Sequence, residues 1–132
     1  MDQERLLTLA REARKNAYAP YSGFSVGAAL LARDGQVFLG ANVENASYTP
    51  TCCAERVALF SAVFAGEREF DAIAVVGGFA DGEKPFCYPC GVCRQALSEF
   101  AREDLRVILA DEAGNLSEMT LGELLPHRFH LS

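Results

Sequence analysis

Two short cysteine-containing segments constrain the fold of this chain more than any other feature of its sequence. Residues 51–56 (TCCAER) and 88–94 (YPCGVCR) each place a thiol where a helix is expected to begin. A thiolate is stabilised at that end of a helix, because the unpaired backbone N–H groups there carry partial positive charge. If the two segments meet, three of their sulfurs form three corners of a tetrahedron. The fold must then bring two helix starts together.

The second segment alone is compatible with several kinds of site. Cys90 and Cys93 have the C-x-x-C spacing of a redox pair, of half of a structural zinc site, or of two ordinary buried thiols. A structural zinc site needs a fourth ligand, and either Cys52 or Cys87 could supply it. Neither a redox pair nor a structural site explains a glutamate two residues after the upstream cysteine.

A hydrolytic zinc site accounts for both segments together. Zinc held by three protein ligands keeps a fourth position for water. Glu55 lies two residues after Cys53 and is the carboxylate placed to move the protons of that water. The sequence therefore predicts one zinc ion per chain, bound by Cys53, Cys90 and Cys93, with Glu55 as the catalytic group.

Both segments resemble the signature of the zinc-dependent deaminases, in which a ligand, one residue and a glutamate are followed later by Pro-Cys-x-x-Cys. Residues 53–55 (CAE) and 89–93 (PCGVC) match this signature, with cysteine in place of histidine as the first ligand. The all-cysteine ligand set, with Arg56 after the first motif and Arg94 after the second, is similar to the small tetrameric cytidine deaminases. The resemblance covers residues 21–129.

This resemblance implies zinc-dependent hydrolytic deamination of cytidine and 2′-deoxycytidine to uridine and 2′-deoxyuridine, with release of ammonia, as in pyrimidine salvage. Glu55 would act as general acid and base without binding the metal. Three thiolates and one Zn²⁺ carry a net charge of −1, and Arg56 and Arg94 are expected to offset it by hydrogen bonds to the sulfurs. For Arg94, a surface or interface charge is an equal alternative.

Two other functions stay open at this point. The first is deamination of another aminopyrimidine nucleoside, such as a nucleoside antibiotic. The second is a non-catalytic structural zinc module, which would bind zinc without turning over any pyrimidine.

The resemblance also implies substrate contacts outside the cysteine motifs. Phe24, within residues 21–24 (YSGF), is expected to pack beside the nucleoside, and Asn42 and Glu44 are expected to bind the ribose hydroxyls. Asn42 and Glu44 are two residues apart, so on a strand they point the same way, although a solvated strand end would show the same pattern. The remaining expected contacts are Tyr48, Ala54 and, from a neighbouring subunit, Phe129.

The order of apolar segments predicts a three-layer α/β/α sandwich with a mixed five-stranded sheet. An amphipathic helix over residues 2–17 comes first, followed by a hairpin of strands 26–32 and 37–44. Helices and strands then alternate, which favours parallel pairs with right-handed crossovers. The later elements are expected as helices 53–65, 90–101 and a short one that starts at the capping box of Thr120 and Glu123 and ends at Leu125, and as strands 70–78, 105–110 and 116–119.

Composition limits the kinds of partner that the protein is expected to bind and the cellular compartment in which it is expected. The length suits a single domain over residues 1–132, and a net charge of −6 disfavours nucleic acid as a partner. No apolar run approaches the roughly 20 residues that cross a bilayer. Three of the first five residues are charged, unlike the start of a signal peptide, and five cysteines is an odd number for a disulfide framework. We therefore expect a cytoplasmic protein with a small-molecule nucleoside substrate and no membrane partner.

The helix expected over residues 53–65 predicts an oligomer. It is apolar on almost every side, and such a helix is buried on every side. A chain of this size can hardly enclose a helix completely, so part of it is expected to meet other subunits. The resemblance implies a homotetramer with shared active sites.

Overall fold

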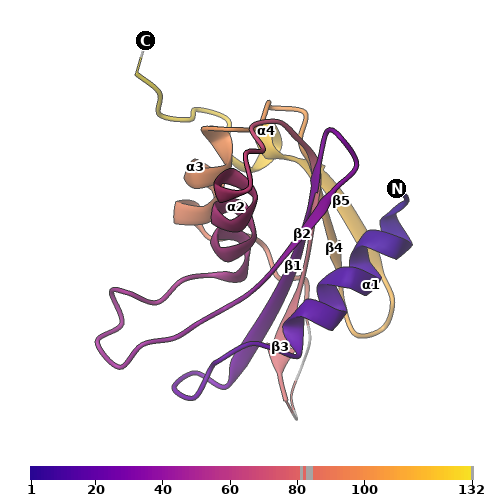
Figure 1. Cartoon of the computed structure of the whole chain (residues 1–132). Coiled ribbons are helices and arrows are strands. Elements are labelled where there is room, and N and C mark those ends of the chain that lie inside the picture. Colours follow the sequence, from indigo (N-terminus) through magenta and orange to yellow (C-terminus); the bar gives the residue numbers. More distant parts are fainter. Residues whose placement is uncertain (81, 83–84, 132) are drawn as a thin grey trace.

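A five-stranded sheet with helices on both faces forms the body of the protein (Figure 1). The computed structural model describes residues 1–131 except 81, 83 and 84. None of the helices formed by these residues combines the length and the apolar character that crossing a bilayer requires. In chain order the elements are α1 (Gln3–Arg14), β1 (Phe24–Ala32), β2 (Val37–Ala41), α2 (Ala54–Phe64), β3 (Phe70–Phe79), α3 (Gly91–Ser98), β4 (Arg106–Ala110), β5 (Leu116–Thr120) and α4 (Leu121–Leu124).

The sheet is mixed, as predicted, with the strand order β2-β1-β3-β4-β5. β1 pairs antiparallel with both β2 and β3, so β2 and β3 run in the same direction and are connected through α2. β3 and β4 are parallel neighbours connected through α3, and β5 is antiparallel to β4. Because α2 follows β2 and α3 follows β3, both helices begin at the same end of the sheet.

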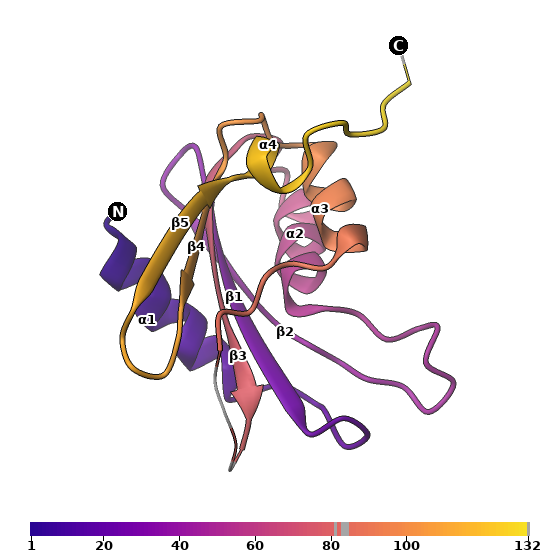
Figure 2. The ribbon, with the colours of Figure 1, turned by 180° about the vertical axis from the view of Figure 1, so that it is seen from behind.

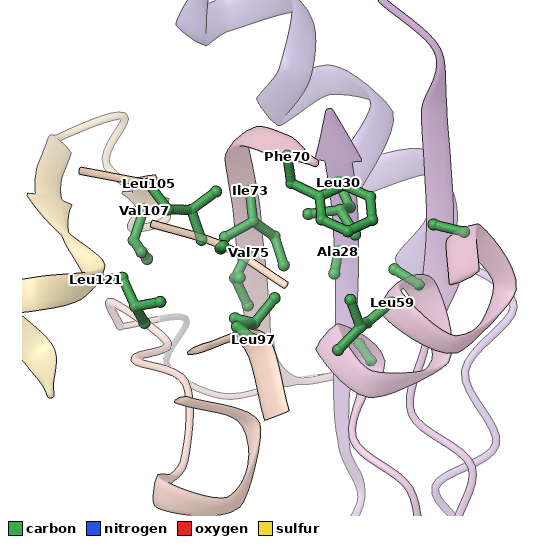
Figure 3. Packing of buried hydrophobic residues seen from close by; sticks show 14 of the residues in the cluster. Ala28, Leu30, Leu59, Phe70, Ile73, Val75, Leu97, Leu105, Val107 and Leu121 are labelled. Carbon is green, nitrogen blue, oxygen red and sulfur yellow. The ribbon is translucent and has the colours of Figure 1, made fainter. Parts of the chain in front are cut away.

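The core is divided between two layers, because alternate residues of a strand face opposite sides of the sheet. In β1, Ala28 and Leu30 pack in one cluster with α2, α3 and α4, whereas Ala29 and Leu31 pack in another cluster with α1. Figures 1 and 2 show α1 on one face and α2 and α3 on the other, and Figure 3 shows Leu59 of α2 beside β1. The predicted three-layer sandwich is confirmed.

Two glycines let the helices pack directly on the backbone of the sheet. A Cβ atom at Gly27 in β1 would lie 2.1 Å from the backbone oxygen of Ala10 in α1. A Cβ atom at Gly40 in β2 would lie 2.3 Å from the backbone oxygen of Ala54, the first residue of α2. Any side chain at Gly40 would push the start of α2 away, so this glycine helps to fix the cysteine segment that precedes the helix.

β2 ends three residues before its predicted end, because the chain leaves the ladder at Asn42. The Oδ1 atom of Asn42 accepts a hydrogen bond from the backbone N–H of Val26 at 2.8 Å. Val43 then forms isolated bridges with Tyr18 and Cys52 instead of pairing with β1. The strand predicted to run on to residue 44 is therefore replaced by a junction of three chain segments.

One side of α2 is left uncovered by the described residues of the chain. Phe60 and Phe64 are 53% and 94% exposed, whereas Ala58, Leu59 and Ala62 of the same helix are buried against the sheet. The expectation that one chain cannot enclose this helix is confirmed.

The short helix α4 begins as predicted. Thr120 Oγ1 accepts from the backbone N–H of Glu123, and the Glu123 carboxylate accepts from the backbone N–H of Thr120, which completes the capping box. The chain after α4 leads away from the body of the protein (Figure 1).

Candidate functional site

The three predicted zinc ligands converge where α2 and α3 begin. Cys53 and Cys90 are the N-cap residues of these helices, and Cys93 lies in the first turn of α3. The Sγ atoms of Cys53 and Cys90 are 3.8 Å apart, those of Cys90 and Cys93 are 3.6 Å apart, and all three lie within 4.8 Å of one another. Neither N-cap thiol bonds to the backbone of its own helix, so both are available to a metal ion.

This arrangement fits zinc. Zn–S bonds of about 2.3 Å in a tetrahedron place the sulfurs about 3.8 Å apart, which is close to the observed separations. Cys52 and Cys87 lie outside the cluster, which has three members within the described part of the chain. Burial raises the pKa of Cys87 to about 12, which keeps this thiol protonated and a poor metal ligand at neutral pH.

The positive charge of Arg56, in α2, lies beside the cysteine sulfurs and offsets their negative charge. Hydrogen bonds from Cys93 and Arg56 lower the pKa of Cys53 to about 5. Arg56 Nη2 donates to Cys53 Sγ at 3.5 Å, as expected for an arginine that offsets thiolate charge. The Nε–H of Arg56 is buried and has no acceptor among the described residues. Because an orphaned buried donor is rare, its position beside three thiols fits a site whose sulfurs carry negative charge.

Glu55 is buried beside the cysteines. It is 3% exposed, and its carboxyl group interacts with the thiol of Cys93. Burial raises the pKa of Glu55 to about 7, because the charged form loses its hydration. A carboxyl group that titrates near neutrality can both accept and donate a proton, which is what general acid–base catalysis requires.

The guanidinium of Arg94 binds backbone carbonyls and, in the described part of the chain, none of the sulfurs expected from the sequence. Its Nε donates to the carbonyl of Pro89 at 2.7 Å, and its Nη1 donates to the carbonyl of Leu124 at 2.8 Å. Pro89 directly precedes Cys90. Arg94 therefore ties the loop that carries this cysteine to the end of α4, because two carbonyl acceptors lie within its reach.

Three chain segments are pinned together beside the cysteine cluster. The backbone N–H of Tyr18 donates to Asn42 O, and that of Glu44 donates to Tyr18 O, both at 2.9 Å. Val43 exchanges two backbone hydrogen bonds with Cys52, at 2.9 and 3.0 Å. The aromatic loop after α1 and the end of the β hairpin are thus brought to the residue that precedes Cys53.

Asn42 holds β1 rather than facing solvent. Its Nδ2 donates to the backbone oxygen of Phe24 at 2.9 Å, in addition to the bond that its Oδ1 accepts from Val26. The residue is only 8% exposed, so the solvated strand end considered for it does not apply. Asn42 and its two bonds fix the backbone position of Phe24.

Glu44 binds the loop before β1. Its Oε1 accepts from the backbone N–H groups of Tyr21 and Ser22 at 3.0 and 3.1 Å, and its Oε2 accepts from the Ser22 hydroxyl. Bonds from the hydroxyl and backbone N–H of Ser22 are the main reason that the pKa of Glu44 is lowered. Ser22 was not among the predicted site residues. Its place in the YSGF segment was visible, but its contact with residue 44 depends on the fold.

Phe24 lies at the same end of the molecule as the cysteines. Its ring packs edge-on against Phe79, with centroids 5.0 Å apart. A Cβ atom at Gly77 would lie 3.1 Å from the Phe24 ring and 2.9 Å from the sulfur of Cys87, so these two side chains meet over Gly77. Cys87 is close enough to Glu55 to be influenced by its charge. Phe24 is therefore next to the residues that surround the cluster.

The other predicted contacts are placed less centrally within one chain. Ala54 is fully buried at the start of α2. Tyr48 is 73% exposed and has a φ of 64°, a left-handed conformation that is uncommon for tyrosine. Phe129 is 68% exposed, but Gln95 Nε2 donates to its carbonyl at 2.9 Å and Gln95 Oε1 accepts from its N–H at 3.3 Å. Gln95 follows Arg94 in the second motif and, like Ser22, was not among the predicted site residues.

A hollow of about 380 Å³ lies beside Tyr48 and Glu44. It is lined by Tyr21, Ser22, Glu44, Tyr48 and Thr51. A larger hollow of about 770 Å³ lies on the α1 face and contains none of the predicted site residues. The smaller hollow is therefore the better candidate for part of the site, because Glu44 and Tyr48, two of the predicted substrate contacts, line it.

Comparison with known proteins agrees with this geometry. Residues 1–109 match the family described as "Cytidine and deoxycytidylate deaminase zinc-binding region". The chain is 51% identical over 129 residues to a cytidine deaminase of Halalkalibacterium halodurans, which covers 98% of this chain and 95% of that protein. A cytidine deaminase of Sporosarcina psychrophila is 49% identical over 98% of this chain and 92% of its own length.

A solved structure shows the same relationship in three dimensions. The crystal structure of a cytidine deaminase from Burkholderia pseudomallei matches with a TM-score of 0.90 and 49% identity, covering 98% of this chain and 100% of that chain. The family match includes both cysteine motifs, and the relatives extend over nearly the whole chain. This protein therefore belongs to the cytidine and deoxycytidylate deaminase family, whose members share a zinc-binding region.

Proposed function

We propose that this protein is a zinc-dependent cytidine deaminase, which converts cytidine and 2′-deoxycytidine to uridine and 2′-deoxyuridine and releases ammonia. The observation that carries the proposal is the convergence of three cysteine sulfurs within 4.8 Å beside the buried carboxyl group of Glu55. Cysteine ligands alone would also suit a structural zinc site. A buried carboxyl group with a pKa near 7 is instead typical of a proton-transfer catalyst.

Cys53, Cys90 and Cys93 would hold the zinc ion, and Arg56 would balance part of the charge of their sulfurs. When bound, zinc supplies Lewis acidity that lowers the pKa of a water molecule from 15.7 towards about 7. Glu55 accepts a proton as the water oxygen bonds to C4 of the pyrimidine, and it gives that proton to N3 of the ring. Glu55 then takes the remaining proton from the new hydroxyl group on C4 and gives it to the amino group, so that the C–N bond breaks and ammonia leaves.

The substrate contacts belong to the same proposal. Phe24 would pack against the base, Ala54 would contact it from the start of α2, and Glu44 would bind the ribose from the hollow that it lines. Asn42 would assist Glu44, because its Nδ2 uses one hydrogen for Phe24 O and has a second hydrogen available. Tyr48, on the rim of the hollow, would close the sugar end of the site.

The direct test is an absorbance assay. Cytidine, incubated with the zinc-loaded protein, should lose absorbance as it becomes uridine, and a sample treated with a chelator should not change it. Zinc binding without turnover of any aminopyrimidine nucleoside would favour the structural zinc module. Turnover of a nucleoside antibiotic but not of cytidine would favour the other deaminase.

Replacing Arg56 with alanine should weaken zinc binding roughly 10- to 100-fold and slow turnover, as loss of an outer-shell partner of a metal ligand typically does. The reason is that Arg56 Nη2 donates to Cys53 Sγ and offsets thiolate charge. Competition with a chelator of known affinity would measure the change, and Arg5→Ala, at an exposed position on α1, is the control. Equal zinc affinity in Arg56→Ala and wild type would leave Arg56 as a structural charge only.

The proposal includes a homotetramer with shared active sites, located in the cytoplasm. Its support is the uncovered side of α2, where Phe60 and Phe64 are exposed. Two projecting segments add to this support, since the loop between β2 and α2 and the tail after α4 both extend from the body (Figures 1 and 2). These segments carry Tyr48 and Phe129. All five cysteines are free thiols, as suits a reducing compartment.

Mixed oligomers should regain activity if Phe129 closes the site of a neighbouring chain. Glu55→Ala and Phe129→Ala chains, co-expressed with different affinity tags, should form some sites with an intact residue of each kind. With random mixing at equal amounts, about one site in four has both. Turnover after purification through both tags should therefore exceed the average of the two parent variants. Activity no higher than that average would place Phe129 in the site of its own chain or outside it.

A further inference from the structure

The carboxylate of Glu44 is held by one short loop, residues 21–22. What we infer from this contact rests on the function proposed above. Among the described residues, the three donors to this carboxylate come from two consecutive positions: the backbone N–H of Tyr21 and the backbone N–H and hydroxyl of Ser22. Glu44 and Ser22 also line the same hollow of about 380 Å³. The loop therefore fixes the direction in which this carboxylate faces the hollow.

The two oxygens of Glu44 are not equivalent. A carboxylate oxygen offers about two lone pairs. Both lone pairs of Oε1 are used, because it accepts from two backbone N–H groups at 3.0 and 3.1 Å. Among the described residues, Oε2 accepts only from the Ser22 hydroxyl. A hydroxyl group of a ligand in the hollow must therefore donate to Oε2, directly beside the Ser22 hydroxyl.

The Ser22 hydroxyl also connects Glu44 to Phe24. Its Oγ accepts a hydrogen bond from the backbone N–H of Phe24 at 2.9 Å while it donates to Glu44. The turn between Ser22 and Phe24 is made by Gly23, whose φ of 71° favours glycine. One hydroxyl thus sets both the acceptor that faces the sugar and the start of the strand that carries the aromatic ring.

We propose that Ser22 is a positioning residue that determines the preference of this protein for nucleosides with a ribose hydroxyl. It holds Glu44 so that Oε2 accepts a hydrogen bond from that hydroxyl. Without the Ser22 hydroxyl, the carboxylate keeps its backbone donors on Oε1 but turns more freely about them. The sugar contact weakens, whereas the chemistry at Glu55 is not touched.

The test compares two substrates that differ only in the sugar. For Ser22→Ala, the KM for cytidine should rise roughly 3- to 10-fold, because the hydrogen bond to the sugar is weakened and not removed, with kcat unchanged. The KM for 2′,3′-dideoxycytidine should rise less, because this nucleoside has no hydroxyl to donate to Oε2. The decisive quantity is the KM ratio of the two nucleosides, since any disturbance of Phe24 affects both equally. Ser22→Thr, which keeps the hydroxyl, should restore the ratio.

A matched control removes a hydroxyl elsewhere. Thr8 on α1 is exposed and donates to the carbonyl of Glu4 at 2.8 Å, and Thr8→Ala should leave the ratio unchanged. A ratio in Ser22→Ala equal to that of wild type overturns the proposal, as does a changed ratio that Ser22→Thr fails to restore. Wild-type protein without turnover of cytidine would instead reject the proposed function. The Ser22 proposal is then decided by calorimetric affinities for uridine and 2′,3′-dideoxyuridine.

Discussion

Replacing Glu55 with alanine should lower kcat for cytidine by roughly 10²- to 10⁴-fold, the usual contribution of a general acid–base group, or more because this residue acts twice. Zinc should remain bound at one ion per chain, since Glu55 is not among the three clustered sulfur ligands. Stopped-time assays and elemental analysis of the same preparation measure both quantities. Glu55→Gln, which keeps the shape of the side chain, should be similarly inactive.

The fold should survive either substitution. Glu55 is 3% exposed, and burying its charged form costs hydration energy, so the glutamine variant should unfold at a temperature no lower than that of wild type. Glu4→Gln, an exposed glutamate on α1, is the control and should change neither turnover nor zinc content. Substantial activity in Glu55→Ala, with zinc in place, would reject the mechanism proposed here.

The cysteine cluster could be predicted because its requirements are local. Each motif places its ligands at the start of a helix, and the alternation of strands and helices places both helix starts at one end of the sheet. The sequence even suggested which cysteines to leave out, and Cys87 indeed lies outside the cluster with its pKa raised by burial. The spacing within each motif and the parallel arrangement of β2 and β3 were sufficient to predict which cysteines meet.

The partners of Asn42 and Glu44 could not be predicted in the same way. Their spacing predicted that both side chains point the same way on a strand, but β2 ends at Ala41. The partners of Asn42 lie in β1, and those of Glu44 lie in the loop before it, about 20 residues earlier in the chain. That loop is brought to them by isolated bridges centred on Val43. Since a period of two does not specify a loop conformation, the role of Ser22 was not visible from the sequence.

Arg94 shows a second limit of sequence reasoning. Its charge and its position after the C-x-x-C motif indicated a sulfur contact, yet it donates to the carbonyls of Pro89 and Leu124. Arginine has five donors and binds whichever acceptors the fold brings near. The acceptor on Leu124 depends on where the end of α4 packs, which is a tertiary property. The sequence left a sulfur contact and a surface or interface charge as equal alternatives for Arg94, and it did not predict the two carbonyl bonds.

Single cysteine-to-serine substitutions should divide the five cysteines into two classes. Cys53→Ser, Cys90→Ser and Cys93→Ser should each lose stoichiometric zinc and all measurable turnover of cytidine. A zinc ion held by three protein ligands has none to spare, and a serine hydroxyl is not deprotonated at neutral pH as a thiolate is. Cys52→Ser and Cys87→Ser should retain one zinc per chain.

Cys87 makes the comparison with Cys93 decisive. Cys93 is buried and Cys87 is half-buried, and both lie near Glu55, so serine introduces a hydroxyl beside the same carboxyl group in each case. Any general cost of that hydroxyl to folding should appear in the thermal unfolding of both variants, whereas loss of zinc should appear in Cys93→Ser alone. Zinc loss in Cys87→Ser would show that a fourth sulfur binds the ion. The open coordination position that a hydrolytic site needs would then be filled, and the centre would be structural rather than catalytic.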